Sequence, residues 1–141
     1  RPARMILTVQ NEVAERICAQ PGEMSLLALS VQIYGRPEIM AEIPASAFYP
    51  QPEVDSAVVR VDLFDTLPIE SEQLNLFFRL AKAGYSQKRK TMRNALSAGM
   101  AWSKESTSEY LDQGGIDPQR RASDQGLRRD LFTSGPGPAS L

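Results

Sequence analysis

The chain has 141 residues, of which 42 % are hydrophobic and 23 % charged, and a formal net charge of −1. It contains no histidine, which excludes imidazole general bases, Ser-His and Cys-His nucleophile pairs and zinc motifs built on histidine. Its single cysteine, Cys18, cannot form an internal disulfide. No apolar run approaches the ~20 residues of a membrane span. We therefore expect a cytoplasmic protein without membrane or metal partners.

The N-terminal part predicts a strand followed by two helices. Residues 5–9 are a short apolar run with β-branched members, which indicates a buried strand. Asn11 is a candidate N-cap for a helix that ends before Pro21-Gly22. Residues 25–34 fit a helix by their apolar spacing and a strand by their hydrophobicity, and we assign a helix.

Two further strands are predicted over residues 39–43 and 55–63. The second alternates, with Ala57, Val59, Val61 and Leu63 on one face and mainly polar side chains on the other. This alternation fits imperfectly with a strand that is covered on both faces.

From residue 68 the hydrophobic period changes from two to about 3.6, which predicts helices. Residues 74–81 form an amphipathic pattern that ends near Gly84. A basic helix is predicted over residues 87–96, with Ser86 as a possible cap. Residues 103–111 and 118–132 predict two more short helices, and residues 135–141 predict a disordered tail.

Charge is distributed unevenly along the chain. Residues 1–72 carry a net charge of −6, residues 73–104 carry seven Lys or Arg and no acid, and residues 105–141 carry −2. The middle block favours a polyanion partner, although a pI near 5.5 argues against a nucleic-acid binder taken as a whole.

The basic helix separates charge from packing. Met92 and Leu96 fall on one face, and Arg89 and Arg93 fall on the other at i and i+4, where two guanidinium groups in a line suit successive phosphates. The alternative interpretation is a solvated helix surface without a ligand.

The connector between the last two predicted strands carries an aromatic pair, Phe48 and Tyr49, beside Pro50 and Pro52. Each proline fixes its own φ and favours extended backbone in the preceding residue, so the position of Phe48 is set before any ligand binds. Phe48 presents its ring to a ligand or fills the core under the loop, and the residues alone favour the core. Asp55 is interpreted as a turn former.

Three segments in this order resemble one family, the ribosomal RNA adenine dimethyltransferases of the KsgA type, with the erythromycin-resistance rRNA methylases as cousins. Residues 9–17 resemble the family's strand-then-helix run. Residues 47–59 are similar to its Phe-x-Pro-x-Pro-x-Val-Asp-Ser-Ala-Val element, and residues 87–96 to its Gln-Arg-Arg-Lys-Thr-Leu-Arg-Asn-x-Leu helix.

The resemblance implies an α/β remnant, the last three strands of a seven-stranded Rossmann-like methyltransferase sheet, with the final strand antiparallel between the other two. Residues 1–66 would form this part, and residues 67–134 a small all-α RNA-binding domain. The family's glycine-rich S-adenosylmethionine loop, acidic ribose-binding residue and Asn-Leu-Pro-Tyr catalytic motif have no counterpart here. We expect them to lie before residue 1.

The resemblance further implies part of an S-adenosylmethionine-dependent enzyme that dimethylates the N6 amines of adjacent adenines in small-subunit rRNA during ribosome biogenesis. Phe48 would stack on the target adenine, and Pro50 and Pro52 would position it. The RNA would be docked by four basic residues, Lys88, Arg89, Lys90 and Arg93. No catalytic, cofactor-binding or metal-binding residue is expected in this chain, which alone would be inactive. The alternatives are a non-catalytic RNA-binding or ribosome-assembly module and a helical protein-interaction domain.

Overall fold

The computed structural model describes residues 2–124. Its strands are β1 (Arg4–Gln10), β2 (Gly35–Ile43) and β3 (Ser56–Leu63), and its helices are α1 (Asn11–Ile17), α2 (Leu26–Gln32), α3 (Leu74–Tyr85), α4 (Met92–Met100) and α5 (Lys104–Gln113). Short 3-10 helices cover Ala45–Ala47, Ser71–Gln73 and Ala122–Asp124. The helix predicted over residues 118–132 is present, within the described residues, only as the 3-10 helix Ala122–Asp124. Residues 125–132 and the predicted tail lie outside the described residues.

The three strands form one sheet in the order β1-β3-β2, and β3 is antiparallel to both neighbours. β1 and β2 are therefore parallel to each other. Val59 of β3 lies opposite Leu7 on one side and Ile39 on the other, so these three apolar side chains share a face. The prediction that the final strand inserts between the other two is confirmed.

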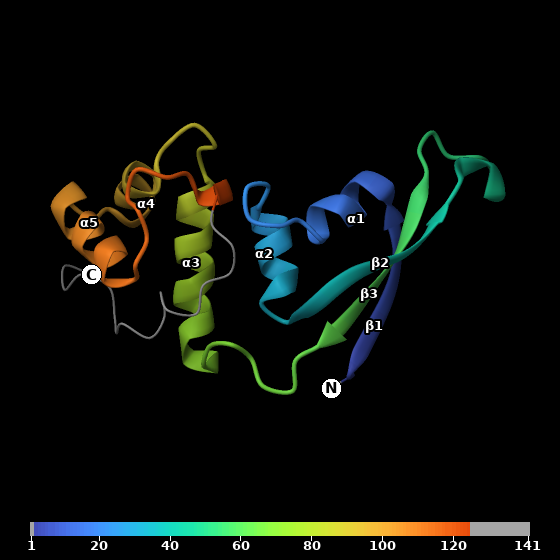
Figure 1. Cartoon of the computed structure of the whole chain (residues 1–141), viewed down its shortest axis with the longest axis horizontal. Coiled ribbons are helices and arrows are strands. Elements are labelled where there is room, and N and C mark those ends of the chain that lie inside the picture. The colour runs from blue at the N-terminus through green and yellow to red at the C-terminus, as the bar shows by residue number, and fades with distance from the viewer. Residues whose placement is uncertain (1, 125–141) are drawn as a thin grey trace.

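Helices α1 and α2 lie on one face of this sheet (Figure 1). On that face Ala57, Val59 and Val61 are buried and pack in one cluster with Ala14 and Ile17 of α1. The alternate residues of β3 are only partly buried. The alternation of β3 thus reflects a sheet whose other face carries no helix within the described residues.

The prediction that β1 is buried is wrong. Met5, Ile6 and Leu7 are exposed to 40 %, 66 % and 37 %. The strand itself is correctly predicted, but within the described residues β1 pairs with β3 alone and is the edge of the sheet. Hydrophobicity predicts the strand without showing how many neighbours it has.

α2 lies between the sheet and the helical part of the chain (Figure 1). Leu27 and Val31 pack against the cluster on the sheet, whereas Ala28, Leu29 and Ile33 belong to a second cluster. That second cluster also holds buried residues of the three later helices, namely Phe77, Leu80, Leu96, Met100, Tyr110 and Leu111. This core contains residues from both sides of position 66 and so marks no boundary there. The division of the chain into two domains at position 66 stays a prediction.

The predicted cap of α1 is wrong. Gln10 is the N-cap and makes no side-chain capping bond, and Asn11 is the first helical residue. The Asn11 amide instead donates to the Glu15 carboxylate over 3.3 Å. Ser25 and Ser103 cap α2 and α5 through their hydroxyl oxygens. None of the described helices is both long and apolar enough to cross a membrane.

Candidate functional site

The connector between β2 and β3 projects beyond the sheet at the end where β1 and β2 reach their carboxyl termini (Figure 1). Phe48 is 38 % exposed and Tyr49 is completely exposed, at 102 % of its reference area. Neither ring belongs to a cluster of buried residues. Phe48 therefore lies outside the core that the described residues form, and the loop exposes two aromatic rings.

This loop is fastened to the sheet through Asp55. Its carboxylate oxygen accepts a hydrogen bond of 2.9 Å from the backbone N–H of Ala45, at the other end of the loop. Its backbone carbonyl accepts a bond of 3.0 Å from the N–H of Asn11, where β1 passes into α1. Asp55 thus joins the two ends of the loop instead of forming a local turn.

The basic residues before α4 do not lie on a helix, although the periodicity predicts one. Residues 87–90, here called the basic turn, form an exposed turn in which the N–H of Lys90 donates to the carbonyl of Gln87 over 3.2 Å. α4 begins at Met92, capped by the hydroxyl of Thr91. Ser86 is not a cap for α4, because its hydroxyl donates to the Ala83 carbonyl over 2.7 Å.

Arg93 is separated from the basic turn by its environment. It lies in the first turn of α4, is partly buried, and has a buried Nε without a hydrogen-bond partner among the described residues. The predicted line of two guanidinium groups from Arg89 to Arg93 on one helix face is therefore wrong. Lys88, Arg89 and Lys90 are all exposed in the turn.

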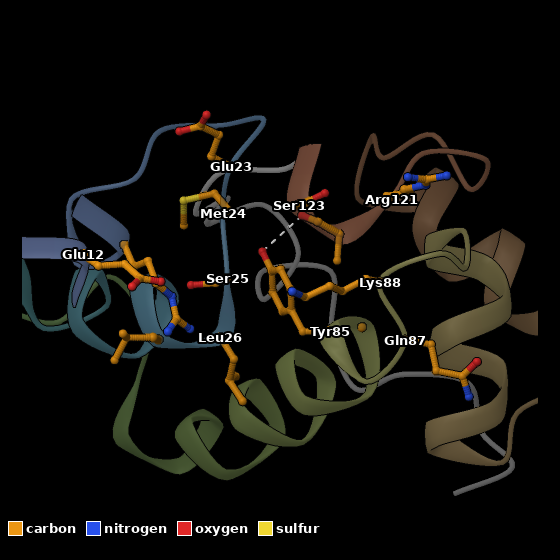
Figure 2. Close-up of a pocket in the computed structure, with 14 residues that line it drawn as sticks. Glu12, Glu23, Met24, Ser25, Leu26, Tyr85, Gln87, Lys88, Arg121 and Ser123 are labelled. Carbon is orange, nitrogen blue, oxygen red and sulfur yellow. Dashed lines mark hydrogen bonds between the residues drawn. The ribbon is translucent and has the colours of Figure 1, made fainter. Parts of the chain in front are cut away.

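Residues 118–124, here called the strap, tie three parts of the chain together. The carbonyls of Pro118 and Arg120 accept from the first backbone N–H groups of α4, and the carbonyl of Ser123 accepts from Gly22 and Met24 before α2. The Tyr85 hydroxyl, at the end of α3, donates to the Ala122 carbonyl over 3.1 Å (Figure 2). The amides at the start of α4 are thus occupied, and positive charge here comes from side chains.

A cleft of about 740 Å³ opens between α1, the segment before α2, the end of α3, the basic turn and the strap (Figure 2). Arg16, Lys88 and Arg121 line it together with Glu12 and Glu23. No ion pair between described residues includes any of the three cations. They remain available to an anionic ligand.

Burial raises the pKa of Tyr85 to about 12, so its hydroxyl is a neutral donor throughout the physiological range. Burial also raises the pKa of the Cys18 thiol, which packs partly against the sheet cluster. A raised pKa lowers the thiolate fraction and disfavours a nucleophilic function.

The fold does not bring Phe48 to the basic residues. The loop of Phe48 and the basic turn lie toward opposite ends of the long axis, with α1 and α2 between them (Figure 1). It does bring Lys88 to one cleft with Arg16 and Arg121, which the sequence did not single out. These residues are far apart in the chain, so no local pattern marks them as neighbours.

Comparison with solved structures shows the fold. The chain superposes on a dimethyladenosine transferase from Plasmodium falciparum with a TM-score of 0.69 at 19 % identity, over 93 % of this chain and 55 % of that one. It superposes on the 23S rRNA methyltransferase ErmE with a TM-score of 0.65 at 17 % identity, over 93 % and 52 %.

Sequence comparison shows higher similarity. The chain is 45 % identical over 122 residues to a ribosomal RNA small subunit methyltransferase A of Dehalococcoides mccartyi, over 86 % of this chain and 42 % of that protein. It is 40 % identical to a protein of the same description from Desulfitobacterium hafniense, over 85 % and 44 %. The chain thus spans less than half the length of these relatives. The family model described as ribosomal RNA adenine dimethylase matches residues 1–127, and the chain belongs to that family.

Proposed function

We propose that this chain is the RNA-docking and base-holding part of an S-adenosylmethionine-dependent enzyme that dimethylates adjacent adenines of small-subunit rRNA during ribosome biogenesis. The observation that carries the proposal is the exposed Phe48 ring on an anchored loop. The loop lies at the carboxyl ends of β1 and β2, the edge where ligands bind in open α/β sheets. Family membership supplies the class of substrate.

Phe48 is assigned to stacking on the target adenine after that base has left the RNA helix. An aromatic face holds a flipped base flat and leaves its exocyclic amine free for methyl transfer, and such stacking contributes ~1–3 kcal/mol per base. Pro50 and Pro52 restrict the backbone that carries the ring. The exposure of Phe48 supports this assignment, because the ring requires no rearrangement of the core to meet a base.

Docking is assigned to the exposed cations of the basic turn, Lys88, Arg89 and Lys90, together with Arg16 and Arg121 in the cleft. Their side chains are free of ion pairs to described residues and suit phosphates. Arg93 is proposed to act at the margin of this surface, since it is partly buried beside the strap.

The described residues do not fit S-adenosylmethionine. β1 ends at Gln10 and α1 begins at Asn11, while β2 ends at Ile43 and is followed by Pro44 and a 3-10 helix, so neither strand is followed by a glycine-rich turn. Such a turn is what lets a backbone approach a cofactor closely. We therefore expect this chain alone neither to bind the cofactor nor to methylate RNA, and calorimetry with the purified chain checks the first point.

RNA binding is tested by the salt dependence of affinity for a structured small-subunit rRNA fragment. Lys88→Ala, Arg89→Ala and Lys90→Ala combined should weaken binding, and each lost phosphate contact should lower the slope of log K against log salt by about 0.7–0.9. The matched control removes three exposed cations outside the turn and cleft, Arg79, Lys82 and Lys104. Affinity that does not depend on salt, or equal effects of both variants, would count against the proposal.

The second candidate is a non-catalytic RNA-binding or ribosome-assembly module. It would use the same basic turn and cleft, so it predicts the same RNA binding by this chain. The two candidates separate only when the cofactor-binding part of a relative is supplied, since the module would remain inactive.

A further inference from the structure

Tyr49 is fully exposed to solvent although it carries a large aromatic ring. Its side chain has 102 % of its reference area open to solvent, more than any other exposed large hydrophobic residue in the described part of the chain. A solvated tyrosine ring contributes nothing to folding through burial. Its neighbour Phe48 has only 38 % of its area exposed, so the loop holds the two rings differently.

The backbone directs these rings to different sides. Phe48 has extended dihedral angles, φ −109° and ψ 151°. Side chains of successive residues in extended backbone leave the chain in opposite directions. One base therefore cannot stack on both rings, and each ring has its own space for a ligand.

The loop itself is held in place on both sides. The Asp55 carboxylate accepts from Ala45 over 2.9 Å, and the N–H groups of Ala47 and Phe48 donate to the carbonyls of Pro44 and Ala45 over 2.9 and 3.2 Å. The two rings are thus presented on an ordered turn, which lowers the entropy lost when a ligand binds.

Charge decides what kind of ligand this loop accepts. Residues 37–59 contain no Lys or Arg and four acids, Glu38, Glu42, Glu53 and Asp55. A phosphate would be repelled here, so binding must come from ring faces. Stacking on unpaired bases meets that condition, because every base has an aromatic face.

We propose that Tyr49 stacks on a second unpaired base, next in the RNA strand to the base that Phe48 holds. This inference rests on the proposed function, since it presupposes an RNA ligand at the loop. The ligand class is two consecutive unpaired bases, each placed against one ring. The phosphates of the same RNA would be met at the basic turn and the cleft instead.

The test measures affinity of the 141-residue chain for an RNA hairpin that carries two adjacent unpaired adenines. The same hairpin is also prepared with an abasic ribose at one or the other adenine. Tyr49→Ala should weaken binding of the intact hairpin about 5- to 150-fold without changing the salt slope. Tyr49→Phe should retain affinity, and Tyr49→Leu should not.

The abasic hairpins make the assignment specific. The effect of Tyr49→Ala should disappear with one abasic hairpin, and the effect of Phe48→Ala with the other. Thermal stability of all Tyr49 variants should match the unmodified chain, since Tyr49 buries nothing. An effect of Tyr49→Ala that persists with both abasic hairpins would overturn the inference. Equal affinity of the Leu and Phe variants would overturn it too, because the contact would then require no aromatic ring.

The two proposals fail in distinguishable ways. If Phe48→Ala and the basic-turn variant both weaken RNA binding but Tyr49→Ala does not, only the inference about Tyr49 is wrong. If none of these substitutions changes RNA affinity, the proposed function is wrong as well.

Discussion

The hydroxyl of Tyr85 donates a hydrogen bond of 3.1 Å to the carbonyl of Ala122, a residue 37 positions later. Tyr85 is the last residue of α3, immediately before the segment that leads into the basic turn. Ala122 lies in the strap, whose next residue, Ser123, binds the segment before α2. The bond therefore helps to fix the basic turn relative to the opposite side of the cleft (Figure 2).

Tyr85→Phe removes this bond and keeps the ring. We expect it to lower the free energy of unfolding by about 0.5–1.5 kcal/mol, the usual net contribution of a hydrogen bond. Urea unfolding measures this change. The matched control is Tyr49→Phe, which removes a hydroxyl from a fully exposed ring and should leave stability unchanged. Equal stabilities of the two variants would show that the strap bond contributes nothing.

The raised pKa of Tyr85 predicts a loss of stability in alkali. The unfolded chain releases this proton near pH 10, whereas the folded chain holds it until about pH 12. The contribution is therefore complete below pH 10 and is lost as the pH rises to 12. Burial shifts the pKa of Tyr110 in the same direction. Tyr85→Phe should show a shallower decline over this window, and parallel curves would contradict the account.

Gly99 lies where α4 packs against Ala83 of α3. A Cβ atom added there would overlap the Cβ of Ala83. Gly99→Ala gains about 1 kcal/mol of helix propensity, but overpacking costs ~1–3 kcal/mol, so we expect a net loss of stability. The control is Gly84→Ala in α3, where the atoms nearest to an added Cβ belong to Met92 and Ala122, at 3.6 Å or more. Thermal unfolding should separate the two, and a Gly99 variant as stable as the control would refute the close contact.

Phe48→Ala should reduce RNA affinity while leaving thermal stability nearly unchanged. The expected loss in binding is ~1–3 kcal/mol, the range for one stacked base. Phe77→Ala is the contrasting variant, because Phe77 is 2 % exposed and its truncation should cost about 3–5 kcal/mol of stability. A fall in melting temperature for Phe48→Ala comparable to that for Phe77→Ala would show that Phe48 is a core residue.

Local patterns predict a helix or strand correctly where that element buries one face and leaves the other less buried. The alternation of β3 and the 3.6-residue period of α3 both correspond to elements with a buried face. The start of α4 is mispredicted because it is set by distant groups. Carbonyls of Pro118 and Arg120 accept its first N–H groups, and no local pattern contains them.

The site is predictable only in part for the same reason. Phe48 is exposed on a loop whose ends are joined by the hydrogen bond from Ala45 to Asp55, and the composition of the loop shows neither the exposure nor the bond. Arg16 and Arg121 meet Lys88 only in the folded chain. By contrast, the motif over residues 47–59 and the unbroken basic block are each continuous in the chain, so the amino-acid sequence alone indicates the family.

The most direct measurement of the central claim joins this chain to the part of the Dehalococcoides mccartyi relative that precedes the matched region. The hybrid is assayed for methyl transfer to adjacent adenines of small-subunit rRNA, beside the intact relative. The account predicts transfer by the hybrid, a loss of rate equivalent to ~1–3 kcal/mol on Phe48→Ala, and no transfer by this chain alone. A hybrid that folds and binds both S-adenosylmethionine and RNA, yet leaves the adenines unmethylated while the relative methylates them, would contradict it.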